Sequence, residues 1–438
     1  MCNIIRYTLC GAWVAVRLAA GPLPTQEPLS TPGPLSFVFD PAAVKGSARL
    51  VGAGDQYKKE RGCGFEPGLE VKGVRGGVMG SPSLYFTTDL PEGNWRVTVT
   101  LRGVPGGGIV AVKAELRRLM LGPVRLAENE KLERTFMVNT RSFRIAARNG
   151  VAAGEVQLKA PRESTAEAWA WDDRLTLEVD GAVLVAVAIT PARVPTVYLL
   201  GDSTVCDQMG EPYASWGQML PRLFKPTVAV ANHGESGETY RDSIGRRRLD
   251  KIISVLQPGD YVLMQFGHND QKQIAAGNGG PFTTYVEELK AHLAAVRRVG
   301  GIPVVISPME RRRIDAAGKL VPTLADYARA ARETAAAEHV AFIDLNALSQ
   351  QFYAALGPEQ SAAAFAAPGG KVDNTHHDNY GAYELARCVA QGIADAKLPL
   401  AAELDREFRQ FDPAKPDDLK SFAVPPSPNF TNQRPLGD

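Results

Sequence analysis

The sequence predicts a chain of two folded parts, an all-β region followed by an α/β region built on a parallel sheet. Over 36–191, short runs of β-branched and aromatic residues are separated by turn-forming residues, which favours a β-sandwich. Over 196–400, apolar runs of strand length alternate with segments of helical spacing, which predicts right-handed crossovers and helices on both faces of the sheet. The length of 438 residues agrees, because a single core rarely grows so large.

The expected strands of the first region are β-branched and aromatic runs at 84–86, 95–101, 135–139 and 175–179. Trp169 and Trp171 could stack on a sugar, but large aromatic residues more often fill a core, and we favour the core. The charged run 113–118 reads as part of a strand. It is expected to form either a solvated face or a contact with the second region.

The second region alternates strands with helices. The strands are expected at 197–200, 227–231, 260–266, 302–306 and 340–344. The helices are expected at 216–224, 285–298, 324–338 and 380–396. Ligands of such sheets bind at the carboxyl ends of the parallel strands, so the residues that follow each strand are the candidates for a site.

The two ends of the chain are expected to lie outside the folded regions. Residues 1–35 are expected to be an export signal and a Pro-rich spacer, because Arg6 precedes an apolar run that ends in small residues. This predicts a secreted or periplasmic protein, and 401–438 would be a C-terminal extension.

The net charge of +1 argues against nucleic acid or a membrane surface as partner. The five cysteines lack metal-ligand spacing, so neither a zinc site nor a disulfide framework is expected.

Polar clusters follow three of the predicted strands. They are Gly201-Asp202-Ser203, the run 232–239, and Gly267-His268-Asn269-Asp270. The carboxyl ends of parallel strands share one edge, so these clusters should meet. A fourth cluster, Asp373-Asn374-Thr375-His376, precedes the last predicted helix, and we expect it at the same edge.

These residue types match the needs of nucleophilic catalysis. A serine hydroxyl such as that of Ser203 becomes a nucleophile when a neighbouring base takes its proton, and histidine is the usual base. A carboxylate behind the imidazole fixes its tautomer, and Asp373 and His376 are close enough for one loop to present both. The oxyanion needs donors already in place, which the Ser203 and Gly237 amides and the Asn269 side chain can provide.

Taken in order, the blocks Gly201-Asp202-Ser203-Thr204, Gln265–Asp270 and Asp373–His376, with the glycine of the second cluster, resemble the SGNH hydrolases. The detailed match is to rhamnogalacturonan acetylesterase-like enzymes. The resemblance implies a three-layer, flavodoxin-like α/β/α domain with Ser203 as nucleophile, His376 as base and Asp373 as its orienter. It also implies an oxyanion hole made by the Ser203 and Gly237 N–H groups and the Asn269 side chain. The β region resembles galactose-binding-like accessory domains of pectin-acting esterases.

The second block departs from the pattern of the family, because Gly237-Glu238-Thr239 stands where Gly-Arg-Ser is usual. This keeps the glycine and leaves the substrate preference open. Other residues compete for the assigned roles. Ser203 could merely cap a helix. Ser236 and Cys206 are rival nucleophiles and His377 is a rival base, while His268 and Asp270 read as structural loop residues.

Four arginines are candidates for substrate binding, because guanidinium groups recognise carboxylates such as those of uronic acids: Arg241, Arg311, Arg312 and Arg313. A solvated loop is the alternative reading for each of them. A lipase would need a broad apolar rim, and Glu235, Glu238 and the arginine run argue against one.

The sequence therefore predicts a serine esterase that removes O-acetyl groups from a plant cell-wall polysaccharide of pectic type. No cofactor or metal is expected, and the partner is the acetylated polysaccharide or oligosaccharide. Alternatives are a deacetylase of xylan, peptidoglycan or sialic acid, and a lipid esterase. A carbohydrate-binding protein with an inactive hydrolase fold is the alternative from outside enzymology.

Overall fold

The structure is a computed structural model that describes residues 33–408 and 410–436. The predicted export signal, and all but the end of the predicted spacer, lie outside the described residues. Within those ranges, no helix is long and apolar enough to cross a membrane.

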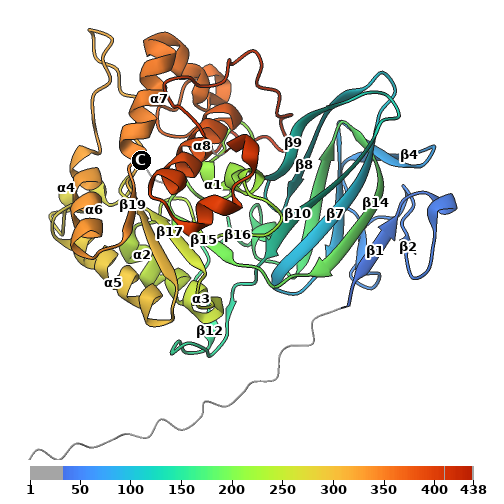
Figure 1. Cartoon of the computed structure of the whole chain (residues 1–438), viewed down its shortest axis with the longest axis horizontal. Coiled ribbons are helices and arrows are strands. Elements are labelled where there is room, and N and C mark those ends of the chain that lie inside the picture. Colours follow the sequence, from blue (N-terminus) through green and yellow to red (C-terminus); the bar gives the residue numbers. More distant parts are fainter. Residues whose placement is uncertain (1–32, 409, 437–438) are drawn as a thin grey trace, which may run out of the picture. The chain divides into compact units, whose positions relative to one another are not determined.

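The first region consists of two main sheets whose strand pairs are antiparallel except for β1 with β2 (Figure 1). One sheet contains β1 Leu35–Val38, β2 Arg49–Leu50, β4 Glu70–Val74, β5 Gly77–Ser81, β7 Gly93–Gly103, β10 Lys131–Thr140 and β14 Ala182–Pro191. The other contains β3 Cys63–Phe65, β6 Ser83–Asp89, β8 Gly108–Ala114, β9 Arg118–Leu126 and β13 Arg174–Asp180. A short ribbon pairs β11 Arg144–Ile145 with β12 Gly154–Glu155.

Apolar residues from both main sheets share one buried core. Val97 and Val99 of β7 and Phe86 of β6 are members of this core, as period-two alternation predicts for strands with one face inward. The four strands expected from the sequence lie within β6, β7, β10 and β13. The identification of this region as a galactose-binding-like sandwich domain stays a prediction.

The second region is built on a parallel five-stranded sheet in the order β16-β15-β17-β18-β19. These strands are β15 Thr196–Gly201, β16 Ala229–Asn232, β17 Tyr261–Gln265, β18 Ile302–Ile306 and β19 Ala341–Ile343. Its helices are α1 Trp216–Met219, α2 Tyr240–Gly245, α3 Arg248–Val255, α4 Gln271–Ala275, α5 Thr284–Arg298, α6 Ala325–Ala337, α7 Leu345–Gln360 and α8 Asn379–Asp395.

The sheet has an apolar core on each face. Leu199 of β15 lies in the core formed with α1, α7 and α8, while the next residue, Leu200, lies in the core formed with α2, α3, α5 and α6 (Figure 1). Successive strand residues point to opposite faces, so a sheet that is buried on both sides is made from continuous apolar runs. The parallel sheet and the mixed α/β content are as predicted.

Two features of this region differ from the prediction. The expected helix at 216–224 is α-helical only to Met219 and continues as a 3-10 turn, because Pro221 has no N–H to extend the α-helical pattern. The helices α2, α3, α4 and α7 were not predicted from the sequence. Arg247, with φ of 62°, separates α2 from α3, so each has too few residues for a clear helical period.

The charged run 113–118 crosses from β8 through a turn into β9 and contacts the α/β region. Arg118 Nε lies 2.7 Å from Asp207 Oδ2, and Arg117 Nη2 lies 2.6 Å from Glu211 Oε1. All four side chains are buried, so the reading as a solvated face was wrong. The segment after residue 400 packs on the same region, because Leu404, Phe408 and Phe411 join the core on the α8 face.

Candidate active site

Ser203 follows the central strand β15 in a tight turn. A Cβ on Gly201 would lie 2.6 Å from Gln265 O and 2.5 Å from Val205 Cγ2, so only glycine fits there. Asp202 holds the turn, because its Oδ1 accepts hydrogen bonds from the amide and hydroxyl of Thr204 at 2.9 and 2.7 Å. These contacts place Ser203 at the carboxyl edge of the sheet.

His376 reaches Ser203 from the loop before α8. Its Nε2 lies 2.9 Å from Ser203 Oγ, although 173 positions separate the two residues in the chain. Its Nδ1 lies 3.0 Å from Asp373 Oδ2. An ionised carboxylate only accepts, so Nδ1 carries the proton and Nε2 is free to accept the serine proton. The structure thus joins the three predicted side chains in one chain of hydrogen bonds.

Asp373 is held as a carboxylate. Burial raises its pKa, but hydrogen bonds from His376 and Arg434 outweigh burial, and the pKa of Asp373 lies well below its usual value. Arg434 Nε and Nη2 lie 2.7 and 3.0 Å from the two carboxylate oxygens. No pattern in the sequence predicted a role for Arg434.

The expected oxyanion donors lie on the loops that follow β15, β16 and β17. Within the described part of the chain, the Ser203 and Gly237 amides have no hydrogen-bond partner, as suits donors kept for a ligand. Gly237 has φ of 75°, a left-handed conformation that favours glycine, and a Cβ there would lie 3.2 Å from Leu436 Cβ. Asn269 Nδ2 donates one hydrogen to Glu238 O at 3.1 Å, which leaves its second hydrogen for an oxyanion.

The rival residues have other partners. Ser236 Oγ accepts from Arg162 Nη2 at 2.9 Å and lies 3.5 Å from Cys206 Sγ. Burial raises the pKa of the Cys206 thiol well above its usual value, so it is held protonated. His377 lies 2.9 Å from the Tyr353 hydroxyl, and burial lowers its pKa to about 3. His376 is the histidine that faces Ser203.

His268 and Asp270 form hydrogen bonds that hold the loop after β17, in agreement with the prediction that both are structural residues. His268 Nδ1 lies 3.3 Å from Asp202 Oδ2 and thereby links the loop after β17 to the turn after β15. Asp270 Oδ1 accepts from the Tyr240 amide at 3.4 Å. Burial, and then the charge of Asp202, raise the pKa of Asp270.

The four candidate arginines have protein partners or lie in solvent. Arg241 Nε is 2.7 Å from Glu288 Oε1. Arg311 donates to Gln271 Oε1 at 2.8 Å, and Arg312 donates to Asn374 Oδ1 at 2.8 Å, beside Asp373. Arg313 is exposed. A role for any of them in binding a uronic acid stays a prediction.

Glu235 and Glu238 do not form a polar rim, contrary to the prediction. Glu235 and Glu238 are 4% and 0% exposed, so neither charge can line a rim. The carboxylates of Glu163, Glu167 and Glu235 form a buried cluster with oxygens within 4.8 Å of one another. Arg162 pairs with Glu167, and Arg248 pairs with Glu163. These cations oppose the charge of the cluster, and we assign no metal to it.

Three residues next to the site were missed: Lys159, Arg434 and Leu436. Lys159 belongs to the first region and its ammonium lies beside Gly237, while Arg434 and Leu436 belong to the C-terminal segment. Each lies in a part of the chain without a recognisable motif. No signal in the sequence pointed to them, because they reach the site through packing alone.

Comparison with known proteins identifies a family and several relatives of this chain. Residues 199–379 match the GDSL-like Lipase/Acylhydrolase family. Rhamnogalacturonan acetylesterase RhgT of Bacillus subtilis is 37% identical over 219 residues, which are 48% of this chain and 93% of the relative. "Probable rhamnogalacturonan acetylesterase YesY" of the same organism is 34% identical over 214 residues, 48% of this chain and 98% of the relative. An uncharacterized esterase, YxiM, also from B. subtilis, is 24% identical over 376 residues, 82% of this chain and 90% of the relative. The chain therefore belongs to the GDSL-like lipase/acylhydrolase family and is an SGNH-type esterase.

Proposed function

We propose that this esterase removes O-acetyl groups from a plant cell-wall polysaccharide of pectic type, with Ser203 as nucleophile. The observation that carries the proposal is the continuous chain of hydrogen bonds from Ser203 Oγ through His376 to Asp373, at 2.9 and 3.0 Å. Such a chain converts a weak nucleophile into an active one.

In the first half of the reaction, Ser203 Oγ forms a bond to the carbonyl carbon of the acetyl group while His376 Nε2 takes the hydroxyl proton. The negative charge that develops on the carbonyl oxygen is stabilised by the Ser203 and Gly237 amides and by Asn269 Nδ2. The bond from the carbonyl carbon to the sugar oxygen then breaks. That oxygen leaves with the proton from His376, and an acetyl-serine remains.

In the second half, water takes the place of the sugar. His376 Nε2 accepts a proton from the water, whose oxygen bonds to the acetyl carbon, and the same three donors stabilise the second oxyanion. The bond from carbon to Ser203 Oγ breaks, the serine regains its proton from His376, and acetate leaves. Asp373 stabilises the imidazolium in both halves because its pKa is low and it stays ionised.

The pectic substrate is supported by the relatives. Two of them are named as a rhamnogalacturonan acetylesterase and a probable one, and the chain matches nearly the whole length of each. Gly237-Glu238-Thr239 departs from the Gly-Arg-Ser that the resemblance implies, so acetylated xylan, peptidoglycan and sialic acid are the competing substrates. Export from the cell stays a prediction, which N-terminal sequencing of the mature protein tests.

Ser203→Ala tests the proposal. We expect wild-type enzyme to release acetate from acetylated rhamnogalacturonan faster than from acetylated xylan, peptidoglycan or sialic acid. Ser203→Ala should lose at least about a thousandfold in kcat on every one of these substrates. A fluorophosphonate should label the wild type and leave the variant unlabelled. A variant of near-normal rate would refute the mechanism, and a preference for another glycan would refute the pectic substrate alone.

A further inference from the structure

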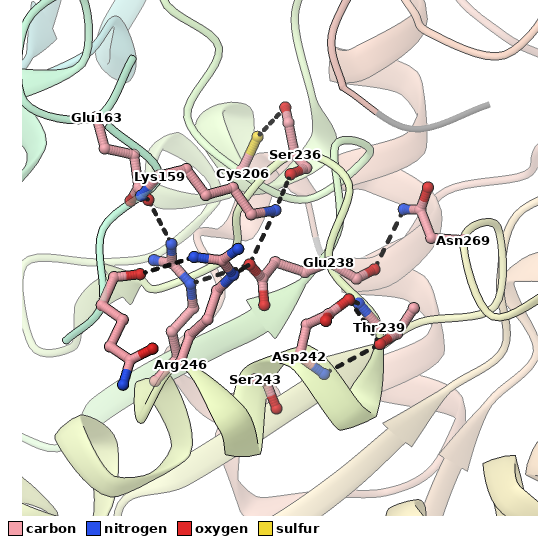
Figure 2. A network of polar contacts seen from close by, with 12 residues as sticks. Lys159, Glu163, Cys206, Ser236, Glu238, Thr239, Asp242, Ser243, Arg246 and Asn269 are labelled. Carbon is pink, nitrogen blue, oxygen red and sulfur yellow. Dashed lines mark hydrogen bonds and ion pairs between the residues drawn. The ribbon is translucent and has the colours of Figure 1, made fainter. Parts of the chain in front are cut away.

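Lys159 comes from the first region, and its ammonium ends beside the segment 236–238, named the oxyanion loop because it contains the Gly237 amide. Its Nζ donates a hydrogen bond to Ser236 O and lies 2.9 Å from Glu238 Oε1. A Cβ on Gly237 would lie 3.5 Å from the same Nζ. Figure 2 shows the ammonium reaching between Ser236 and Glu238, with the Asn269 amide directed at the same loop. Lys159 therefore contacts the residues on both sides of Gly237.

The hydrogen bond to Ser236 O acts on the donor that the reaction uses. Ser236 C=O and Gly237 N–H belong to one planar peptide unit, so fixing the carbonyl also fixes the direction of the N–H. A cation that donates to the carbonyl polarises the unit and makes its N–H a stronger donor. We propose that Lys159 is a positioning residue that orients and strengthens the Gly237 amide as an oxyanion donor. This inference rests on the proposed function.

The surrounding contacts hold Lys159 in place. The Lys159 amide donates to Glu163 Oε2 at 2.6 Å, and the same carboxylate oxygen lies 2.5 Å from Arg248 Nη2. Arg248 Nε in turn lies 3.5 Å from Glu238 Oε1, the oxygen that Lys159 also contacts. The Lys159 side chain is only 13% exposed, so solvent screens these charges weakly. The network thus ties the backbone at 159–163 to the oxyanion loop.

Glu238 gives this network its negative charge. Its side chain is 0% exposed, so the loop carries a buried carboxylate that needs a cation. Lys159 supplies one from outside 199–379, the residues that match the family. The first region would then contribute a positioning residue to the active site, in addition to any role in binding carbohydrate.

The test compares Lys159→Met, Lys159→Arg and Arg246→Met on 4-nitrophenyl acetate. Arg246 is the matched control, because its Nε lies 3.5 Å from Glu238 Oε1 and it makes no contact with Ser236 O among the described residues. We expect Lys159→Met to lower kcat at least about tenfold with KM within about twofold, since one oxyanion donor is typically worth a hundredfold or more. Lys159→Arg should recover most of kcat, and Arg246→Met should stay within about twofold of wild type.

Three outcomes would overturn the inference. These are a kcat for Lys159→Met within about twofold of wild type, no recovery by Lys159→Arg, or an equal loss in Arg246→Met. The midpoints of the pH profile of kcat/KM should not move in Lys159→Met, because Ser203 and His376 are untouched. If Lys159→Met fails to fold by circular dichroism, Lys159→Gln is judged by the same criteria. Failure of the proposed function is separate, because it shows as activity in Ser203→Ala.

Discussion

Arg434 donates two hydrogen bonds to Asp373, the carboxylate behind His376, at 2.7 and 3.0 Å. Asp373 therefore accepts hydrogen bonds from two side chains, that of His376 on its own loop and that of Arg434 in the C-terminal segment. The Asp373 side chain is 3% exposed and that of Arg434 is 47% exposed, so the pair lies at the boundary between the site and solvent. Leu436, two positions further on, lies against Gly237.

Replacing Arg434 with glutamine should lower the free energy of unfolding in a pH-dependent way. The pKa of Asp373 is lowered in the folded protein, so its carboxylate stabilises the fold above the unfolded pKa of about 4, and this stabilisation is lost as the pH falls below it. Without Arg434 the pKa of Asp373 rises toward its ordinary value. We expect Arg434→Gln to cost about 1 kcal/mol or less near neutral pH, because Arg434 is half exposed.

Urea unfolding of wild type and Arg434→Gln near neutral pH and at about pH 3 measures this effect. The difference between the two proteins should shrink at the lower pH. A difference of the same size at both values would show that the hydrogen bonds to Asp373 are not its source. Arg313→Gln, at an exposed position, is the control and should match wild type at both values.

The two adjacent histidines should behave oppositely. His376→Gln removes the proposed base next to Ser203 and should lower kcat at least about a thousandfold. His377→Gln should keep kcat within about threefold, because its ring faces Tyr353 and glutamine can also bond to that hydroxyl. Acetate release by both variants measures the contrast. Comparable losses in both would mean that the structure assigns the base to the wrong ring.

Asn269 should contribute to kcat and little to KM. In the proposed mechanism its side-chain hydrogen meets charge that exists only in the transition state, so Asn269→Ala should lower kcat about a hundredfold to a thousandfold. Asn269→Asp should lose at least as much, because it puts a negative oxygen where a donor is needed. Steady-state kinetics on an acetyl ester decides the matter, and a kcat for Asn269→Ala within about threefold of wild type would exclude the role.

The ion pair between Arg118 and Asp207 should stabilise the fold substantially. Both side chains are buried, and Arg118 also donates to Asn139 O at 2.8 Å. Arg118→Ala leaves a buried carboxylate with a weaker partner and should cost about 3–5 kcal/mol of unfolding free energy. Arg134→Ala, at an exposed position of β10, should cost less than about 0.5 kcal/mol. Equal midpoints for the two variants in thermal unfolding would contradict this.

Much of the α/β region was predictable because its strands are long apolar runs. The runs that became β15, β17 and β18 are buried on both faces, and burial on both faces demands that pattern. The helices α2 and α3 were not predictable. They contain six and eight residues, and what ends the first is a left-handed Arg247 that local sequence does not require.

The residue types of the site were also determined by the sequence. Short sequence blocks at strand ends or before a helix contain the candidate residues Ser203, Asn269, Asp373 and His376. The parallel topology brings the carboxyl ends of the strands to one edge of the sheet. Only the tertiary structure decided that His376 and not His377 faces Ser203, and that Glu238 is buried. It also decided that Lys159 lies beside Gly237 and that Arg434 lies beside Asp373. The contacts of the last two span 77 and 61 positions. Contacts of that range are chosen by the packing of whole segments, which local residue patterns do not encode.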